Sequence, residues 1–131
     1  MLYLRGQLER NQSGELFGRR GDYDSRHGSA DRRDKKNLRG YFKVLVGGDL
    51  VTNGKPAPDI FLLAAEKLNI EAEDCYIFED SFNGIRAAAA SGGAAIMIPD
   101  TVQPTDDIKR ICAAVFNDLN EARRAIEHGD I

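Results

Sequence analysis

The chain has 131 residues, of which 42% are hydrophobic and 30% are charged, and its formal net charge is -3. This length fits a single domain with a modest core. No run approaches the roughly 20 apolar residues of a membrane span and no secretory signal is present, so we expect a soluble cytoplasmic protein without a membrane partner. The two cysteines, Cys75 and Cys112, match no metal-ligand spacing, and we expect Cys75 to be a reduced, buried thiol.

The charges are divided unevenly along the chain. Residues 1–40 carry 10 Lys and Arg against 6 Asp and Glu, whereas residues 41–131 carry 8 against 15. Residues 18–36 (GRRGDYDSRHGSADRRDKK) show neither a helical nor a strand period, so we predict that residues 1–40 are poorly ordered and that residues 41–131 form the folded domain. The cations of the first segment are interleaved with acids and almost without aromatics, which argues against nucleic-acid binding.

Beyond residue 40, short apolar runs predict buried strands. The first of them, residues 41–48 (YFKVLVGG), ends in two glycines. Three more follow at residues 75–80 (CYIFED), 94–100 (AAIMIPD) and 113–116 (AAVF).

Helical patterns separate these runs. Residues 58–70 (PDIFLLAAEKLNI) predict a helix whose first turn accommodates Pro58, and residues 81–93 predict an alanine-rich helix that stops at Gly92. A last helix is predicted from the N-cap Asp118 to His128, with a stop at Gly129. The alternation of strands and helices predicts a three-layer, Rossmann-like α/β fold around a parallel sheet.

Two acids stand where the predicted strand 75–80 ends. In open α/β sheets, ligands bind beyond the carboxyl ends of the strands, where the following helices point their N-termini. Glu79 and Asp80 would form an oxygen-rich site there that suits Mg²⁺. Alternatively, Asp80 or Ser81 only caps the next helix while Glu79 is solvated, and the spacing alone leaves both interpretations open.

The heptapeptide NGKPAPD, residues 53–59, holds a lysine in a backbone of restricted conformation. Lys55 follows Gly54 and precedes Pro56 and Pro58, so its backbone loses little entropy on ordering. A fixed ammonium suits a phosphate or a cluster of carboxylates, although a solvated loop lysine is the alternative.

Together, NGKPAPDIF and YIFEDSFNGIRAAAASGGAAIMIPD resemble the C-terminal half of haloacid dehalogenase-like hydrolases, specifically the β-phosphoglucomutase-like phosphatases and phosphohexomutases. The resemblance covers about residues 38–131. It implies that Lys55 orders the phosphate and a nucleophilic aspartate, and that Glu79 and Asp80 hold Mg²⁺ directly or through water. The implied activity is Mg²⁺-dependent phosphoryl transfer on small phosphorylated metabolites such as sugar phosphates.

The chain departs from this family in its first part. Family members begin with a strand that ends in Asp-x-Asp-Gly-Thr, whose first aspartate is the nucleophile. Here Asp22-Tyr23-Asp24-Ser25 has the spacing but neither the preceding strand nor the Gly-Thr, so no nucleophile is identified. Ser25 and Ser29 lie about where the family's phosphate-binding Ser or Thr is expected, yet no apolar strand precedes them. The helical cap that selects the substrate is also missing, so the sequence names no substrate.

These departures predict an incomplete haloacid dehalogenase-like core that lacks the cap and the nucleophile strand. Such a core has open sheet edges that invite self-association. We hypothesise a truncated or frame-disrupted family member in which residues 1–36 come from a shifted reading frame. The chain would then be an impaired phosphatase, active only if another segment or polypeptide supplies a nucleophile, or a non-catalytic remnant that binds Mg²⁺ or phosphate weakly.

Overall fold

The centre of the fold is a sheet built around β4 (Cys75–Glu79). The computed structural model describes residues 2–4, 8–10, 16–18, 44 and 46–131. Within these, the strand order is β1-β4-β5-β6, with β1 at Leu2–Leu4, β5 at Ala94–Met97 and β6 at Ala114–Val115. The strands β4, β5 and β6 are parallel, as predicted, whereas β1 pairs antiparallel with β4. A separate antiparallel pair joins β2 (Leu8–Arg10) to β3 (Leu16–Gly18).

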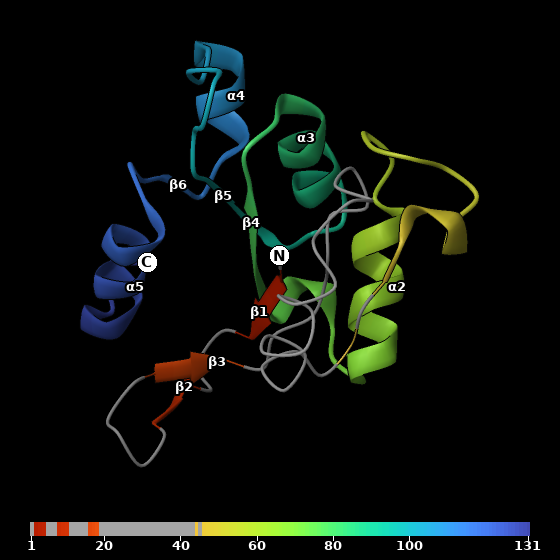
Figure 1. Ribbon diagram of the computed structural model, residues 1–131, viewed down its shortest axis with the longest axis horizontal. Coiled ribbons are helices and arrows are strands. Elements are labelled where there is room, and N and C mark those ends of the chain that lie inside the picture. Colours follow the sequence, from red (N-terminus) through yellow and green to blue (C-terminus); the bar gives the residue numbers. More distant parts are fainter. Residues whose placement is uncertain (1, 5–7, 11–15, 19–43, 45) are drawn as a thin grey trace, which may run out of the picture.

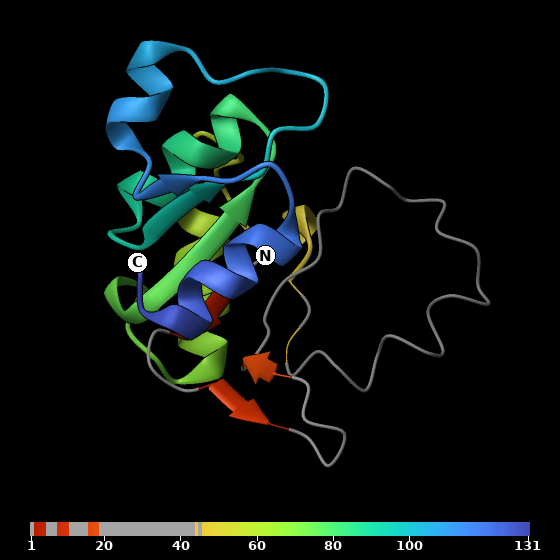
Figure 2. The same cartoon turned by 90° about the vertical axis from the view of Figure 1, so that its left-hand side faces the viewer.

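Helices cover both faces of this sheet. On one side lie α2 (Asp59–Leu68), α3 (Phe82–Ala90) and the short α4 (Asp106–Ile111), and on the other lies α5 (Leu119–His128) (Figure 1). Figure 2 shows α5 in front of the strands with α3 behind them. This arrangement of helix, sheet and helix layers confirms the predicted α/β fold class.

The alternation of side chains along β4 distributes the core between the two faces. Cys75 and Ile77 pack in the cluster with α2 and α3, whereas Tyr76 and Phe78 pack in the cluster with α5. All five residues of β4 are buried, because both faces of the sheet are covered. The same alternation directs Glu79, the last residue of the strand, to the side of α2 and α3.

The ends of the helices follow the predicted signals closely. Asp118 caps α5, since its Oδ1 accepts a hydrogen bond from the Glu121 backbone N–H at 2.8 Å, and Gly129 ends the helix with φ +75°. Gly92 follows α3 with φ +87°, also as predicted. The helix α2 begins one residue later than predicted, because Pro58 is its N-cap rather than part of its first turn.

The predicted strand 41–48 is not found among its described residues. Val44 makes only an isolated β-bridge, Val46 lies outside any strand, and the 3₁₀ turn η2 (Gly48–Leu50) follows. Both sides of β4 are already paired, with β1 and β5, so this run does not extend the sheet beside β4. Its apolar character is used in packing instead, because Val46 is buried in the cluster with α2 and α3.

Some elements were not predicted at all. The short strands β1, β2 and β3 fall in the segment before residue 41, and α4 and the 3₁₀ turn η3 (Ala72–Asp74) fall in stretches read as connections. Most of residues 1–40 lies outside the described residues, so the predicted poor order and the domain boundary stay predictions. No helix in the described ranges is both long and apolar enough to span a bilayer.

Candidate functional site

The candidate site lies at the carboxyl end of β4 and begins with a buried acid. Glu79 is only 8% exposed, on the face covered by α2 and α3. A carboxylate that is removed from water in this way is stable only when it is paired and hydrogen-bonded. The question for the site is therefore what pairs with Glu79.

The partner of Glu79 is Lys55. The Lys55 Nζ lies 2.5 Å from Glu79 Oε1, which makes a short ion pair across 24 residues of sequence. The side chain of Lys55 is 17% exposed and that of Glu79 is 5% exposed, so the pair is largely shielded from water. The ammonium also lies 5.0 Å from the centre of the Phe61 ring, within the range of a cation–π contact. Lys55 is thus held in a defined position, which excludes the alternative of a solvated loop lysine.

The loop that carries Lys55 is anchored on both sides. The Asn53 backbone N–H and Nδ2 donate to Asp59 Oδ2 at 3.2 and 3.0 Å, which ties the loop to the first residue of α2. The Ala57 N–H donates to the Gly54 carbonyl at 3.0 Å and closes a turn around Lys55. These bonds explain why the heptapeptide 53–59 presents its lysine in one place.

A glycine in α3 makes room for the carboxylate. A Cβ at Gly84 would lie 1.9 Å from Glu79 Oε2 and 2.5 Å from its carboxyl carbon. A side chain of any size at position 84 would therefore push Glu79 away from its present place. The glycine allows the first turn of α3 to approach the carboxylate, which is the reason for a helix-weakening residue at that position.

Asp80 faces a different environment from Glu79. It is exposed and lines an open hollow beside the first turn of α3 and the loop after β5. The hollow is lined by Asp80, Ser81, Phe82, Asn83, Arg86, Thr101 and Val102. Ser81 is the N-cap of α3, because its Oγ accepts from the Gly84 N–H at 3.1 Å. Of the two interpretations left open by the sequence, the cap belongs to Ser81 and not to Asp80, and Glu79 is not solvated.

The carboxylates of Glu79 and Asp80 fit Mg²⁺ in different ways. Mg²⁺ takes one or two carboxylates and completes its coordination with water and phosphate oxygens. Asp80 opens on the hollow and suits a direct ligand, whereas Glu79 is engaged by Lys55 and suits a contact through water. The described part of the chain contains no group of three or more His, Cys, Asp or Glu that could hold a metal. The donors therefore fit a cation that shares its coordination with a phosphate, rather than a closed protein cage.

Other predicted residues cannot be placed. Ser25, Ser29 and the Asp22-Tyr23-Asp24 segment lie outside the described residues. Sequence reasoning also missed Phe61 and Gly84 as parts of the site. Gly84 inside a helical pattern was a local signal of close approach, but nothing in the sequence names the acid that approaches it.

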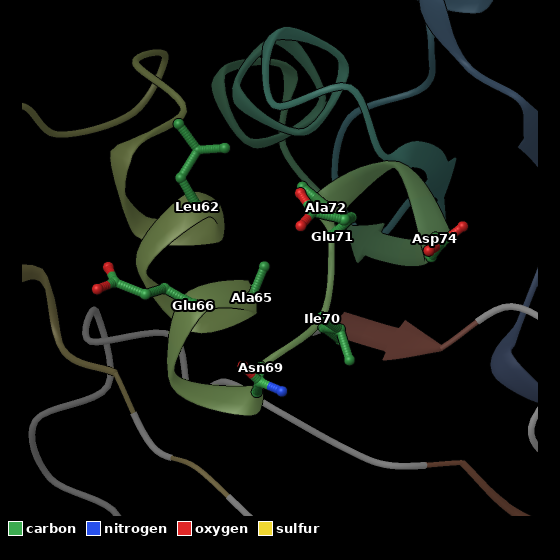
Figure 3. Close-up of a pocket in the computed structure, with 8 residues that line it drawn as sticks. All are labelled: Leu62, Ala65, Glu66, Asn69, Ile70, Glu71, Ala72 and Asp74. Atoms are coloured by element: carbon green, nitrogen blue, oxygen red, sulfur yellow. The ribbon is translucent and has the colours of Figure 1, made fainter.

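A second hollow lies at the opposite, amino end of β4. It is formed by the end of α2 and by η3, and its lining residues are Leu62, Ala65, Glu66, Asn69, Ile70, Glu71, Ala72 and Asp74. In Figure 3 the carboxylates of Glu66 and Asp74 point away from each other. This hollow is acidic but does not gather its acids around one point.

Comparison with known proteins identifies the family. The model of the haloacid dehalogenase-like hydrolases matches residues 24–92, more than half of the 131 residues. The chain belongs to this family. The match contains Lys55, Glu79 and Asp80, and it also contains Ser25, because it begins upstream of the stretch 38–131 that carried the resemblance.

The chain is similar to phosphatases of phosphorylated carbohydrates. It is 37% identical over 101 residues to the phosphorylated carbohydrates phosphatase of Thermotoga maritima, covering 77% of the chain and 39% of that protein. It is 46% identical over 59 residues to the fructose-1-phosphate phosphatase YqaB of Escherichia coli, covering 45% of the chain and 31% of that protein. The chain therefore spans well under half the length of these two relatives.

A solved structure resembles this chain in fold and sequence. It is a HAD family hydrolase from Deinococcus radiodurans with bound phosphate and sodium, which superposes with a TM-score of 0.60 at 27% identity. The superposition covers 78% of this chain and 50% of that one.

Proposed function

We propose that this chain supplies Mg²⁺-binding and phosphate-binding residues of a phosphatase or phosphohexomutase that acts on small phosphorylated metabolites such as sugar phosphates. One observation carries the proposal: the Lys55 ammonium is held 2.5 Å from Glu79, the last residue of β4, which Asp80 follows in the chain. This edge of a parallel sheet is where α/β proteins bind ligands. The relatives that act on phosphorylated carbohydrates support the substrate class.

In this proposal each side chain has a separate task. Lys55 neutralises negative charge on the phosphoryl group, and its fixed loop avoids reorganisation when that charge develops. Asp80 would hold Mg²⁺, which supplies further neutralisation of the phosphate oxygens when bound. Glu79 orients Lys55, and Ser25, which lies within the family match, would contribute a hydroxyl to the phosphate.

A second candidate is a binding module without turnover. The observation that favours it is the nucleophile motif: Asp-x-Asp occurs once, at Asp22 and Asp24, and Ser25 follows in place of Gly-Thr. Without an aspartyl nucleophile the family's covalent step has no acceptor for the phosphoryl group. The chain would then bind phosphate and Mg²⁺ but not hydrolyse esters.

One experiment separates the two candidates. Hydrolysis of p-nitrophenyl phosphate and calorimetric binding of inorganic phosphate are both measured with and without Mg²⁺, for wild type, Asp80→Asn and the control Asp74→Asn. Mg²⁺-dependent turnover that is lost only in Asp80→Asn supports the phosphatase. Mg²⁺-dependent binding without turnover supports the binding module, and the absence of both contradicts both candidates.

We also infer that the protein works in a reducing compartment such as the cytoplasm. The support is that Cys75 and Cys112 are free thiols, and Cys75 is buried as predicted. Self-association through open sheet edges and the lack of nucleic-acid or membrane partners stay predictions.

A further inference from the structure

Phe61 makes a contact with Lys55 in addition to its packing in the core. It lies in the first turn of α2, is fully buried and belongs to the cluster between the sheet, α2 and α3. Its ring centre is also 5.0 Å from Lys55 Nζ, inside the distance at which a ring attracts an ammonium. A leucine or methionine would offer no such contact.

The ring acts together with Glu79. The ammonium lies 2.5 Å from Glu79 Oε1 while the Phe61 ring lies nearby, so two partners of different chemistry restrain one cation. The carboxylate is restrained in turn by α3, because Gly84 leaves just the space that Oε2 occupies. A flexible four-carbon side chain is thereby confined to one region of the site.

We propose that Phe61 is a positioning residue for Lys55, which it holds against Glu79 so that the ammonium is ready to meet a phosphate at the end of β4. An ammonium has three N–H donors, and among the described residues Glu79 is its one hydrogen-bond acceptor. The ring accepts no directed hydrogen bond of ordinary geometry, so donors are left for phosphate oxygens. The last step, from a held cation to phosphate binding, rests on the proposed function.

The position of the ammonium is tested by NMR of lysine labelled with ¹³C at Cε. The Lys55 Hε signals, assigned by their loss in Lys55→Arg, should be shifted upfield by the ring current of Phe61. Phe61→Leu should return them to the ordinary lysine position. Ile96→Ala is the matched control, because it removes the same number of side-chain carbons from a fully buried residue in the cluster on the other face of the sheet. If Phe61→Leu does not fold, Phe61→Met removes the ring while its flexible side chain adapts to the space that is left.

Phosphate titration then tests the purpose of the contact. In the presence of Mg²⁺, Phe61→Leu should raise the Kd for inorganic phosphate by about threefold to thirtyfold, the range expected for a partly shielded cation–π contact. Ile96→Ala should leave this Kd unchanged. The proposal is overturned if wild type shows no upfield shift, or if Phe61→Leu and Ile96→Ala behave alike in both measurements. Wild type that shows the shift but binds no phosphate contradicts the proposed function and leaves the position of Lys55 established.

Discussion

The two ends of β4 both carry acids beside an open hollow, but they are built differently. At the carboxyl end, Glu79 is buried, paired with Lys55 at 2.5 Å and fitted against Gly84. At the amino end, Glu71 and Asp74 are exposed, and neither has an ion pair within the described part of the chain. The contrast teaches that acid content alone does not distinguish a built charge pair from a solvated surface. A buried countercharge with a space shaped for it does, because burial makes each partner depend on the other.

The largest effect is expected when the pair itself is broken. Lys55→Met leaves the buried Glu79 carboxylate without its cation and should lower the free energy of unfolding by about 3–5 kcal/mol, measured by urea denaturation. Lys67→Met makes the same chemical change at an exposed position of α2 and should cost within about 0.5 kcal/mol. Equal losses in the two variants would show that the Lys55–Glu79 pair is no stronger than a surface contact.

At the amino end of β4, we expect an effect of alkaline pH on the stability of the fold, and no effect on ligand binding. Burial, reinforced by the nearby charge of Asp74, raises the pKa of the Cys75 thiol from 9.0 to about 11. As the pH rises, the Cys75 thiol loses its proton in the unfolded chain before it does so in the folded protein. The contribution of this thiol to the free energy of unfolding is therefore complete below pH 9 and is lost as the pH rises toward 11, by up to about 2–3 kcal/mol.

Cys75→Ala isolates this contribution. The variant is less stable at neutral pH but should lose less further stability between pH 9 and 11 than wild type does. Circular dichroism melts across that pH range provide the measurement. If stability falls in parallel with pH in the two proteins, Cys75 is not the cause of the alkaline loss of stability.

A smaller loss is expected when the space beside Glu79 is filled. The Cβ of Gly84→Ala would overlap the Glu79 carboxylate and should cost about 1–3 kcal/mol in stability, although alanine favours a helix. Gly54→Ala is the matched control, since nothing lies within 4 Å of its added Cβ. Phosphate affinity should also fall in Gly84→Ala, and an unchanged affinity in that variant would show that the place of Glu79 does not matter for the ligand.

Removal of either of two helix caps should lower stability equally, but only one removal should weaken phosphate binding. Ser81→Ala and Asp118→Ala each remove the side-chain acceptor of an N-cap, of α3 and α5 respectively, so each should cost about 1 kcal/mol. Only α3 begins at the candidate site, so only Ser81→Ala should weaken phosphate binding in titration calorimetry. Equal phosphate affinity in both variants would show that the N-terminus of α3 does not contribute to phosphate binding.

The smallest effect is expected from the acids of the second hollow. Glu71→Gln should change stability by less than about 0.5 kcal/mol and leave phosphate binding as in wild type, because the residue is exposed. A clear loss of phosphate affinity in Glu71→Gln, measured beside Asp80→Asn, would contradict the assignment of function to the carboxyl end alone.

The local sequence determined most elements from residue 58 onward, α4 and η3 excepted, and the chemistry of the candidate site. Apolar runs with sharp ends located β4, β5 and β6, and cap residues such as Asp118, Gly92 and Gly129 located helix ends, because these signals act over a few residues. Lys55, Glu79 and Asp80 could be proposed from the same stretch, since a stiff loop and a strand end are local features.

Only the tertiary structure decided which of these residues meet. The Lys55–Glu79 contact joins positions 24 residues apart, and Phe61 and Gly84 take part because α2 and α3 pack on the same face of the sheet. Likewise, residues 41–48 read as a strand, but a strand needs a neighbour, and among the described residues of this run Val44 makes only an isolated β-bridge. Hydrogen-bond pairing and burial depend on the whole sheet, so no local pattern could have fixed either outcome.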